Sequence, residues 1–240
     1  MALIEISNLA KHYVSGEETV EALRGVDLSI SAGEFVSIMG QSGSGKSTLL
    51  SVLGGMNHPT EGEVEMAGVK LYTLPGERLA DFRAQNLGFV FQSFHLIPYL
   101  TALENVMLPL AIAKMNNQEK RAKAKEALEQ VGLAAKVDRL PNQLSGGEQE
   151  RVAIARAVVN KPHILLADEP TGNLDSKTSD EVMGLFRELN KSGQTVVMVT
   201  HNPENCAYTD RTIFLRDGRV VAEREDVAVA EVCTLASGRG

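Results

Sequence analysis

The 240-residue sequence has no tryptophan and only two cysteines, Cys206 and Cys233. Two distant cysteines without a CxxC spacing argue against a disulfide framework or a cysteine-based zinc site, and they favour a reducing compartment. No apolar run approaches the roughly 20 residues of a membrane-spanning helix, and the first ten residues do not resemble a secretory leader. If the protein works at a membrane, we expect another chain to cross it.

The sequence also lacks an excess of positive charge, because it has 24 Lys and Arg against 31 Asp and Glu, a net charge of −7, and no Lys/Arg block could follow a phosphate backbone. The one basic cluster, 120–125 (KRAKAK), alternates with alanine and is followed by acids, which predicts a solvated helix face. We therefore expect no nucleic-acid partner. The chain is long enough to bury a sizeable core, as a soluble globular protein does.

Residues 40–47, GQSGSGKS, match the G-x-x-x-x-G-K-[ST] pattern of a P-loop between an apolar strand and a helix. Backbone N–H groups of such a loop cradle phosphates, Lys46 can reach the β- and γ-phosphates, and Ser47 can bind Mg²⁺. The alternative is a Gly/Ser loop that ends in an exposed lysine. The predicted ATP-binding residues are Gly40, Gln41, Ser42, Gly43, Ser44, Gly45, Lys46, Ser47 and Thr48.

Apolar patterns around this loop predict an α/β fold with a P-loop NTPase core. Strands are expected at Leu3–Leu9, Val26–Ile30, Glu34–Met39, Leu87–Phe91, 163–168 and Thr195–Thr200, with antiparallel hairpins at 62–71 and 214–221. A helix between the last two strands predicts a parallel crossover. From about 94 to 160 the pattern is helical. We expect one domain over 1–240, with a mixed sheet, an antiparallel β edge subdomain and an inserted α-helical lobe.

Polar residues follow several predicted strands, where ligands gather in an open parallel sheet. Asp168 could hold Mg²⁺, and the adjacent Glu169 could orient or deprotonate a water, which favours hydrolysis over transfer to a second substrate. His201 either contacts the γ-phosphate or is structural. Gln92 either binds Mg²⁺ or water, or is a surface loop residue.

A second anion-binding pattern stands at 144–149, LSGGEQ, before another amphipathic helix. It lacks a lysine, a metal ligand and a base, so it is half a site. Ser145, Gly146 and Gly147 are either an ordinary helix cap or a half-site that closes over a nucleotide held by another copy. In the second case, two copies arranged head to tail would sandwich two ATP molecules.

Together these residues resemble the ATP-binding cassette (ABC) ATPases over nearly the whole chain. Tyr13 matches the A-loop residue that stacks on adenine, although packing is the alternative. The other matches are 40–47 (Walker A), Gln92 (Q-loop), 144–148 (signature), 164–168 (Walker B), Glu169 (catalytic glutamate), 173–175 (D-loop) and His201 (H-loop). The usual signature ends in glutamine, whereas here Glu148 is expected to be a helix-start residue.

The resemblance assigns roles to these positions. It implies catalysis by Glu169, His201, Gln92 and Lys46, and Mg²⁺ binding by Ser47, Gln92 and Asp168. It also implies contacts in trans to ATP from Ser145, Gly146, Gly147 and Asp175.

Segments such as LSGGEQERVAIARA and LLADEPTGNLD look most like the lipoprotein-release (LolD) and macrolide-export (MacB) branch, which includes the cell-division ATPase FtsE. The resemblance implies a homodimeric, peripheral ATPase on the cytoplasmic face of a bacterial inner membrane. Separate permease subunits would dock short helices near Gln92 and the helical lobe. A regulatory ATPase that signals without moving cargo stays open. A soluble ABC ATPase acting on DNA or the ribosome, or a small-molecule kinase, is less favoured.

Overall fold

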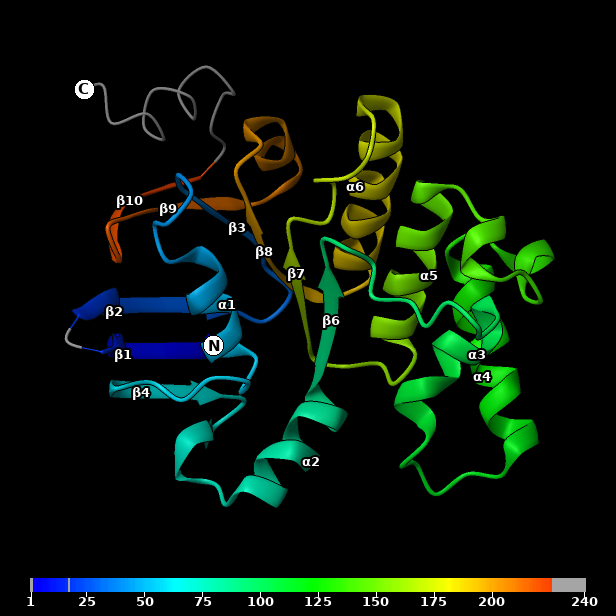
Figure 1. Ribbon diagram of the computed structural model, residues 1–240, viewed down its shortest axis with the longest axis horizontal. Helices are drawn as coiled ribbons and strands as arrows, with labels where there is room; N and C mark the ends of the chain where they lie inside the picture. The colour runs from blue at the N-terminus through cyan, green and yellow to red at the C-terminus, as the bar shows by residue number, and fades with distance from the viewer. Residues whose placement is uncertain (1, 17, 226–240) are drawn as a thin grey trace.

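Two β-sheets frame the protein, which a computed structural model describes over residues 2–16 and 18–225 (Figure 1). The antiparallel sheet has the order β2-β1-β4-β5 and the larger sheet the order β10-β9-β3-β8-β7-β6. In the larger sheet, β6, β7, β8, β3 and β9 are parallel and β10 is antiparallel. The strands are β1 Ala2–Ser15, β2 Glu18–Ser31, β3 Phe35–Met39, β4 Glu61–Met66, β5 Val69–Lys70, β6 Leu87–Phe91, β7 Ile164–Asp168, β8 Thr195–Thr200, β9 Arg211–Arg216 and β10 Arg219–Glu225. The predicted mixed sheet and antiparallel subdomain are confirmed.

Helices cover both faces of the larger sheet. Helix α1 (Lys46–Leu53) packs in the core between the two sheets, where its leucines meet Val36 and Ile38 of β3. On the opposite face lie α5 (Gly146–Val158) and α6 (Ser176–Lys191), whose Val182 and Phe186 are fully buried. The chain from β7 through α6 to β8 is the predicted parallel crossover.

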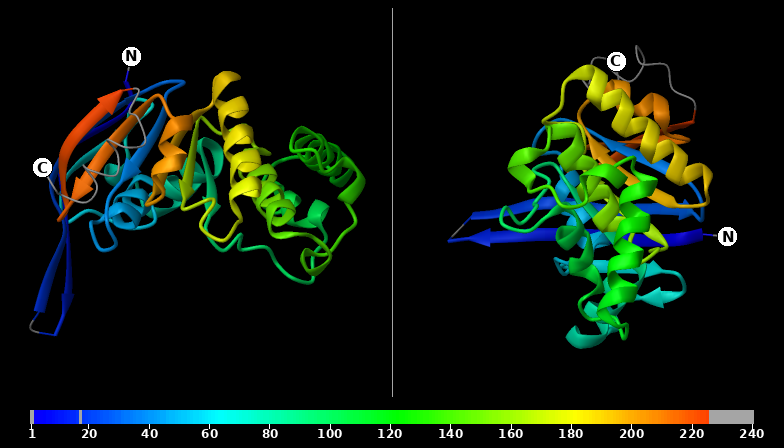
Figure 2. Two further views of the ribbon diagram at one scale, coloured as in Figure 1. Left: turned by 90° about the horizontal axis from the view of Figure 1, so that it is seen from above. Right: turned by 90° about the vertical axis from the view of Figure 1, so that its right-hand side faces the viewer.

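Helices α3 (Ala102–Met107) and α4 (Asn117–Gln130) pack against α5 at the far end of the molecule from the antiparallel sheet (Figures 1 and 2). Ala124 and Leu128 of α4 are buried, and Gly132 follows the helix with φ 74°. These helices occupy the segment where a helical pattern was predicted. Among residues 2–16 and 18–225, no helix is both long and apolar enough to cross a membrane.

Strands β1 and β2 are much longer than the predicted Leu3–Leu9 and Val26–Ile30, since β1 continues to Ser15 and β2 starts at Glu18, and the two pair as a hairpin that was not predicted. Its end projects beyond the body of the protein (Figure 2). Tyr13, Val14 and Val20 are exposed there beside polar neighbours, so this part of the sequence does not show the alternation of apolar and polar residues that reveals a half-buried strand. Helix α2 (Gly76–Asn86), which leads into β6, was also not predicted.

Candidate functional site

The glycine-rich loop between β3 and α1 forms one wall of a cleft of ≈ 580 Å³. A Cβ at Gly40 would stand 2.1 Å from the carbonyl oxygen of Leu215, and a Cβ at Gly45 would stand 2.4 Å from that of Ala22. Gly43, in contrast, lines the cleft and has no atom within 4 Å of its Cβ position. The loop is therefore packed tightly against β2 and β9 on one side while leaving space beside Gly43.

Lys46, at the first position of α1, places a cation in this wall. Its side-chain Nζ donates to the carbonyl oxygens of Gly40 at 2.8 Å and Gln41 at 2.9 Å. Burial lowers the pKa of Lys46, and the carboxylates of Glu169 and Asp168 oppose that shift. A cation anchored by backbone carbonyls beside open N–H groups suits an anionic ligand.

Ser47 and Asp168 form an oxygen-rich corner of the cleft. The Ser47 hydroxyl donates to Asp168 Oδ1 at 3.3 Å. Burial raises the pKa of Asp168, and the hydrogen bond from Ser47 opposes the shift. Such oxygens suit Mg²⁺, and Gln92 lines the same cleft. No group of three His, Cys, Asp or Glu residues in the described part of the chain is arranged to hold a metal ion by itself, so a metal here would need phosphate oxygens or water to complete its ligands.

Glu169 is fixed at the end of β7 in a left-handed conformation, with φ 48°. Its N–H donates to the Val199 carbonyl at 3.0 Å, and its Oε2 lies 2.9 Å from His201 Nδ1. The Glu169 side chain is 14% exposed, whereas the His201 side chain is 66% exposed. A strained residue held by its surroundings is typical of a functional site. The arrangement holds a carboxylate inside the cleft with an imidazole at its rim.

Gln92 follows β6 directly, so it reaches the same edge of the sheet as Asp168 and His201. Asn173 Nδ2 donates to the Gln92 carbonyl at 2.7 Å. A Cβ at Gly172 would stand 2.8 Å from Gln92 Nε2, so the glycine makes room for this side chain. The predicted gathering of polar residues at the carboxyl ends of parallel strands is present.

Tyr13 lies opposite Val20 in the β1–β2 hairpin, and of this described pair only Val20 lines the cleft. The Tyr13 side-chain hydroxyl accepts from Asn57 Nδ2 at 2.5 Å, and Lys11 Nζ stands 5.0 Å from the ring centroid. The sequence did not reveal Val20, because a single valine in a polar segment carries no signal. The pairing of β2 with β1 brings Val20 to the cleft.

The segment 144–148 is separate, and none of its residues is among the described residues that line the cleft. The Ser145 side-chain Oγ accepts from Glu148 N–H at 3.3 Å, and Glu148 Oε2 accepts from Ser145 N–H at 2.9 Å. The backbone N–H of Ser145 holds the pKa of Glu148 low, and Lys136 contributes to that shift. Ser145 therefore caps α5, and Glu148 lies in its first turn as predicted. This cap does not exclude a contact with ATP in another copy, which stays a prediction.

The two signature glycines lie against the start of α6. A Cβ at Gly147 would stand 2.3 Å from Thr178 Cγ2, and a Cβ at Gly146 would stand 3.4 Å from Leu174 Cδ2. Asp175 caps α6 by accepting from the Thr178 N–H at 3.0 Å. The signature and the predicted D-loop are therefore neighbours within one chain, whereas their contact with ATP in trans stays a prediction.

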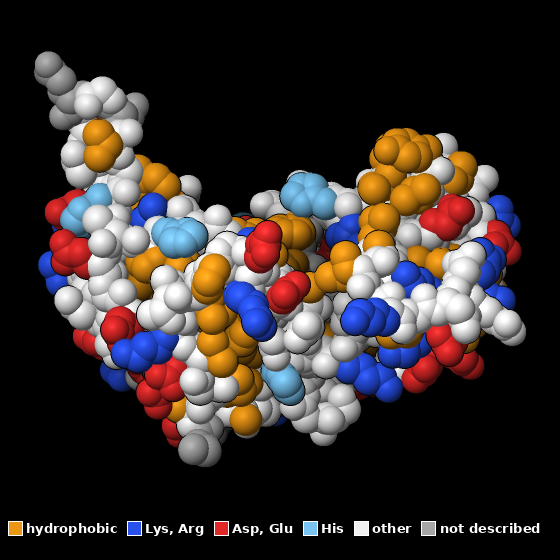
Figure 3. Space-filling model, turned by 90° about the horizontal axis from the view of Figure 1, so that it is seen from below, with side chains coloured by type: hydrophobic (Ala, Val, Ile, Leu, Met, Phe, Trp, Pro, Cys, Tyr) orange, Lys and Arg blue, Asp and Glu red, His pale blue; other side chains and the backbone are white. Residues whose placement is uncertain are grey.

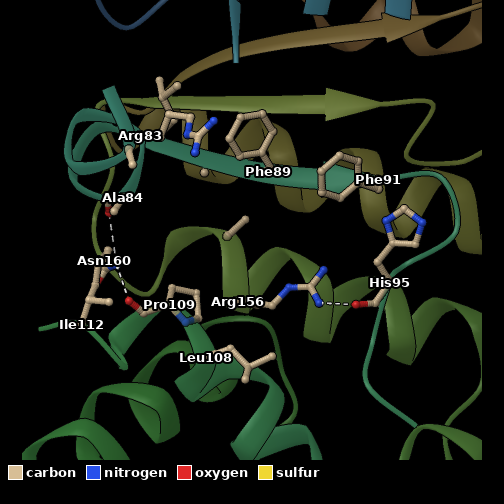
Figure 4. Close-up of a pocket in the computed structure, with 14 residues that line it drawn as sticks. Arg83, Ala84, Phe89, Phe91, His95, Leu108, Pro109, Ile112, Arg156 and Asn160 are labelled. Atoms are coloured by element: carbon tan, nitrogen blue, oxygen red, sulfur yellow. Dashed lines mark hydrogen bonds between the residues drawn. The ribbon is translucent and has the colours of Figure 1, made fainter. Parts of the chain in front are cut away.

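A groove of ≈ 550 Å³, which we call the lobe groove, lies between α2, β6 and α5 (Figure 4). Its lining is mostly apolar and includes two cationic side chains, Arg83 and Arg156, and no carboxylate among the described lining residues. Ile112 is 72% exposed at its edge. Figure 3 shows a concave face between the projecting hairpin and the helices at the other end of the molecule.

Comparison with known proteins agrees with this geometry. A profile of the ABC transporter family matches residues 23–172. The lipoprotein-releasing ATP-binding protein LolD of Geobacter metallireducens is 50% identical over 92% of this chain and 99% of its own. The macrolide export ATP-binding/permease protein MacB of Rhodopirellula baltica is 46% identical over 99% of this chain, which spans 35% of that protein.

Solved structures of the cassette MJ0796 from Methanocaldococcus jannaschii have the same fold, with a TM-score of 0.86. One of them is a dimeric post-hydrolysis state bound to ADP and Pi, 48% identical over 94% of this chain and 99% of that one. The chain therefore belongs to the ABC transporter family, as an ATP-binding and ATP-hydrolysing subunit of the branch to which LolD and MacB belong.

Proposed function

We propose that the chain powers a separate membrane permease of the lipoprotein-release or export type, as a peripheral ATPase on the cytoplasmic face of the inner membrane. The observation that carries this proposal is the cleft itself. It combines the P-loop, Asp168, Glu169 and His201 on one chain, while the anion-binding start of α5 stands outside it. Half of a nucleotide site is thus left for a second copy to use.

In the proposed site, Lys46 and the loop N–H groups hold the phosphates of ATP. Ser47, Asp168 and Gln92 would bind Mg²⁺, which would neutralise phosphate charge. Glu169 orients or deprotonates the attacking water, and His201 fixes the Glu169 carboxylate. Ser145, Gly146 and Gly147 of the second copy close over the γ-phosphate with their helix N-terminus. The dimeric MJ0796 structures support this arrangement.

The lobe groove supplies the contact with the permease. Its apolar lining suits the apolar face of a short helix, and Arg83 and Arg156 suit an acidic end of that helix. The MacB relative supports a permease partner, because it is an ATP-binding/permease protein and this chain spans 35% of its length.

The ATP clamp is tested with Glu169→Gln, which keeps the shape of the side chain but removes its charge. We expect the variant to bind ATP, hydrolyse it at a rate lowered by about 100-fold or more, and run as a dimer with Mg-ATP in size-exclusion chromatography. Lys46→Ala in the same background should stay monomeric. A Glu169→Gln chain that remains a monomer at high protein and ATP concentrations would contradict the clamp.

The permease contact is tested with Ile112→Glu, which places a charge at the edge of the lobe groove. We expect it to abolish co-purification of an integral membrane protein from native membranes, since a carboxylate is costly in an apolar contact. Val14→Glu is the matched control, because Val14 is 75% exposed on the projecting hairpin, away from the groove. Equal recovery of the membrane protein with both variants would exclude the groove as the contact.

A further inference from the structure

Arg156 makes an unusual pair of contacts in the lobe groove. Its Nη1 donates to the carbonyl oxygen of His95 at 2.6 Å (Figure 4), and its Nη2 donates to that of Phe94 at 2.7 Å. Phe94 and His95 are consecutive non-glycine residues with φ 56° and 46°, a left-handed conformation that each adopts at an energetic cost. One guanidinium group therefore binds both residues of a strained turn.

This turn lies between three functional regions. Gln92 is two residues before Phe94. The Phe94 ring lies beside the signature, since a Cβ at Gly146 would stand 3.9 Å from its Cζ. The His95 ring lines the lobe groove, with its centroid 5.0 Å from that of Phe91. A shift of this turn would move groups at the cleft, at the start of α5 and in the groove together.

Other side chains hold the two ends of the segment 92–100 but not the carbonyl groups of residues 94 and 95. Asn173 holds the Gln92 carbonyl, and the buried Asn105 accepts from the Ile97 N–H at 2.8 Å and donates to the Leu100 carbonyl at 3.0 Å. The backbone of residues 94 and 95 is held by Arg156, which reaches it from α5, the helix that Ser145 caps. A planar group with two parallel donors suits two neighbouring carbonyls, and a lysine ammonium does not reproduce that geometry.

We propose that Arg156 is a positioning residue that sets the place of Gln92 in the nucleotide cleft and of the Phe94 ring against Gly146. The proposal rests on the proposed function, because it concerns Mg-ATP hydrolysis at that cleft. It adds that this side chain ties α5 to the backbone of the Gln92 loop at residues 94 and 95. Binding of a partner in the lobe groove is thereby linked, through the turn at residues 94 and 95, to the positions of the nucleotide cleft and of the segment 144–148.

Arg156→Lys tests the proposal, because it keeps the charge and loses the two-donor geometry. We expect kcat to fall about tenfold and the Mg²⁺ concentration for half-maximal ATPase at saturating ATP to rise several-fold. ATP binding by calorimetry should change by less than about twofold, since the P-loop contacts are intact. A purely structural role would lower the melting temperature and the active fraction without changing the Mg²⁺ requirement.

Arg187→Lys is the matched control. Arg187 also makes a two-partner contact through Nη1, to Asn190 Oδ1 at 3.0 Å and Asp210 Oδ1 at 2.6 Å, but it lies on α6 and none of its partners lines the cleft. The proposal is overturned if Arg156→Lys matches Arg187→Lys in kcat and in Mg²⁺ requirement. An unsubstituted chain without Mg-dependent ATPase would instead refute the proposed function.

Phe94→Ala provides a second test if Arg156→Lys does not fold. It keeps the carbonyl that Arg156 binds but removes the ring beside Gly146. Combined with Glu169→Gln, it should weaken the ATP-dependent dimer about tenfold or more while leaving ATP binding to the monomer unchanged. Dimerisation as tight as that of Glu169→Gln alone would overturn the proposal.

Discussion

At the scale of single residues, Glu150 departs from ordinary packing. It lies on α5 with 0% exposure, and neither carboxylate oxygen has a hydrogen-bond partner. Burial raises its pKa to about 8, and the Arg156 charge only partly opposes that shift. A buried carboxyl without partners is costly when charged, so Glu150 is protonated in the folded protein at neutral pH.

Glu150 should therefore make stability depend on pH. Between about pH 4.5, where an unfolded chain releases this proton, and about pH 8, the folded chain keeps it, so the free energy of unfolding falls as pH rises. Glu150→Gln removes this dependence. We expect it to stabilise the protein by about 1–3 kcal/mol at pH 8.5 and to change stability little at pH 4.5, measured by urea unfolding.

The exposed Glu188→Gln on α6 is the control for that measurement, since it removes the same charge without changing the core. The difference between Glu150→Gln and the unsubstituted chain isolates this one group from the other titrating residues. An unfolding free energy that falls equally between pH 4.5 and 8.5 in Glu150→Gln and in the unsubstituted chain would contradict the buried acid. A Glu150→Gln chain that is less stable than the unsubstituted chain at pH 8.5 would also contradict it.

At the scale of elements, the sequence predicted those whose pattern depends on local contacts. The P-loop between β3 and α1, the strand before Asp168 and the Ser145 cap were all found, because turn glycines, apolar runs and capping residues stand at fixed spacings. The same logic brought Gln92, Asp168 and His201 to one edge of the sheet, since parallel strands share their carboxyl ends.

Features that depend on distant contacts were not predictable. The apolar residues at the end of the β1–β2 hairpin, Tyr13, Val14 and Val20, are exposed, so this end is defined by strand pairing, which places Val20 at the cleft. Arg156 contacts His95 and Phe94, which precede it by 61 and 62 positions, and such a contact likewise has no local signal in the sequence. The left-handed conformations of Phe94 and His95 are also invisible in sequence, because neither residue is glycine.

In the proposed function, the start of α5 both caps the helix and closes over ATP in a partner copy, and one pair of variants can separate these two roles. Aspartate caps helices as well as serine does, but its charge would face the γ-phosphate of ATP in a partner copy. Ser145→Asp should therefore keep the melting temperature and lose the ATP-dependent dimer in the Glu169→Gln background. Ser145→Ala should lose about 1 kcal/mol of stability and keep part of the dimer. If the segment is only a cap, Ser145→Asp will dimerise at least as well as Ser145→Ala.

At the scale of the whole molecule, the proposed function makes the cleft and the segment 144–148 two incomplete parts of the same centre. No residue of 144–149 lines the cleft in the described chain, and that segment holds no lysine or metal ligand of the P-loop kind. In a two-fold symmetric pair, each copy supplies the part that the other lacks, so both centres depend on both chains. That dependence can be measured by mixing variants that damage different halves.

Lys46→Ala damages the cleft and Ser145→Asp damages the closing segment, so each variant alone should lack ATPase activity. In an equimolar mixture, a mixed dimer has one intact centre, made by the P-loop of the Ser145→Asp chain and the 144–148 segment of the Lys46→Ala chain. Random pairing of independent centres restores up to about a quarter of the unsubstituted activity, measured as phosphate release. Mixing Lys46→Ala with a chain that carries both substitutions should restore none, because every centre then has a damaged P-loop. A centre contained in one chain predicts no recovery in either mixture, since neither variant owns a complete set of groups.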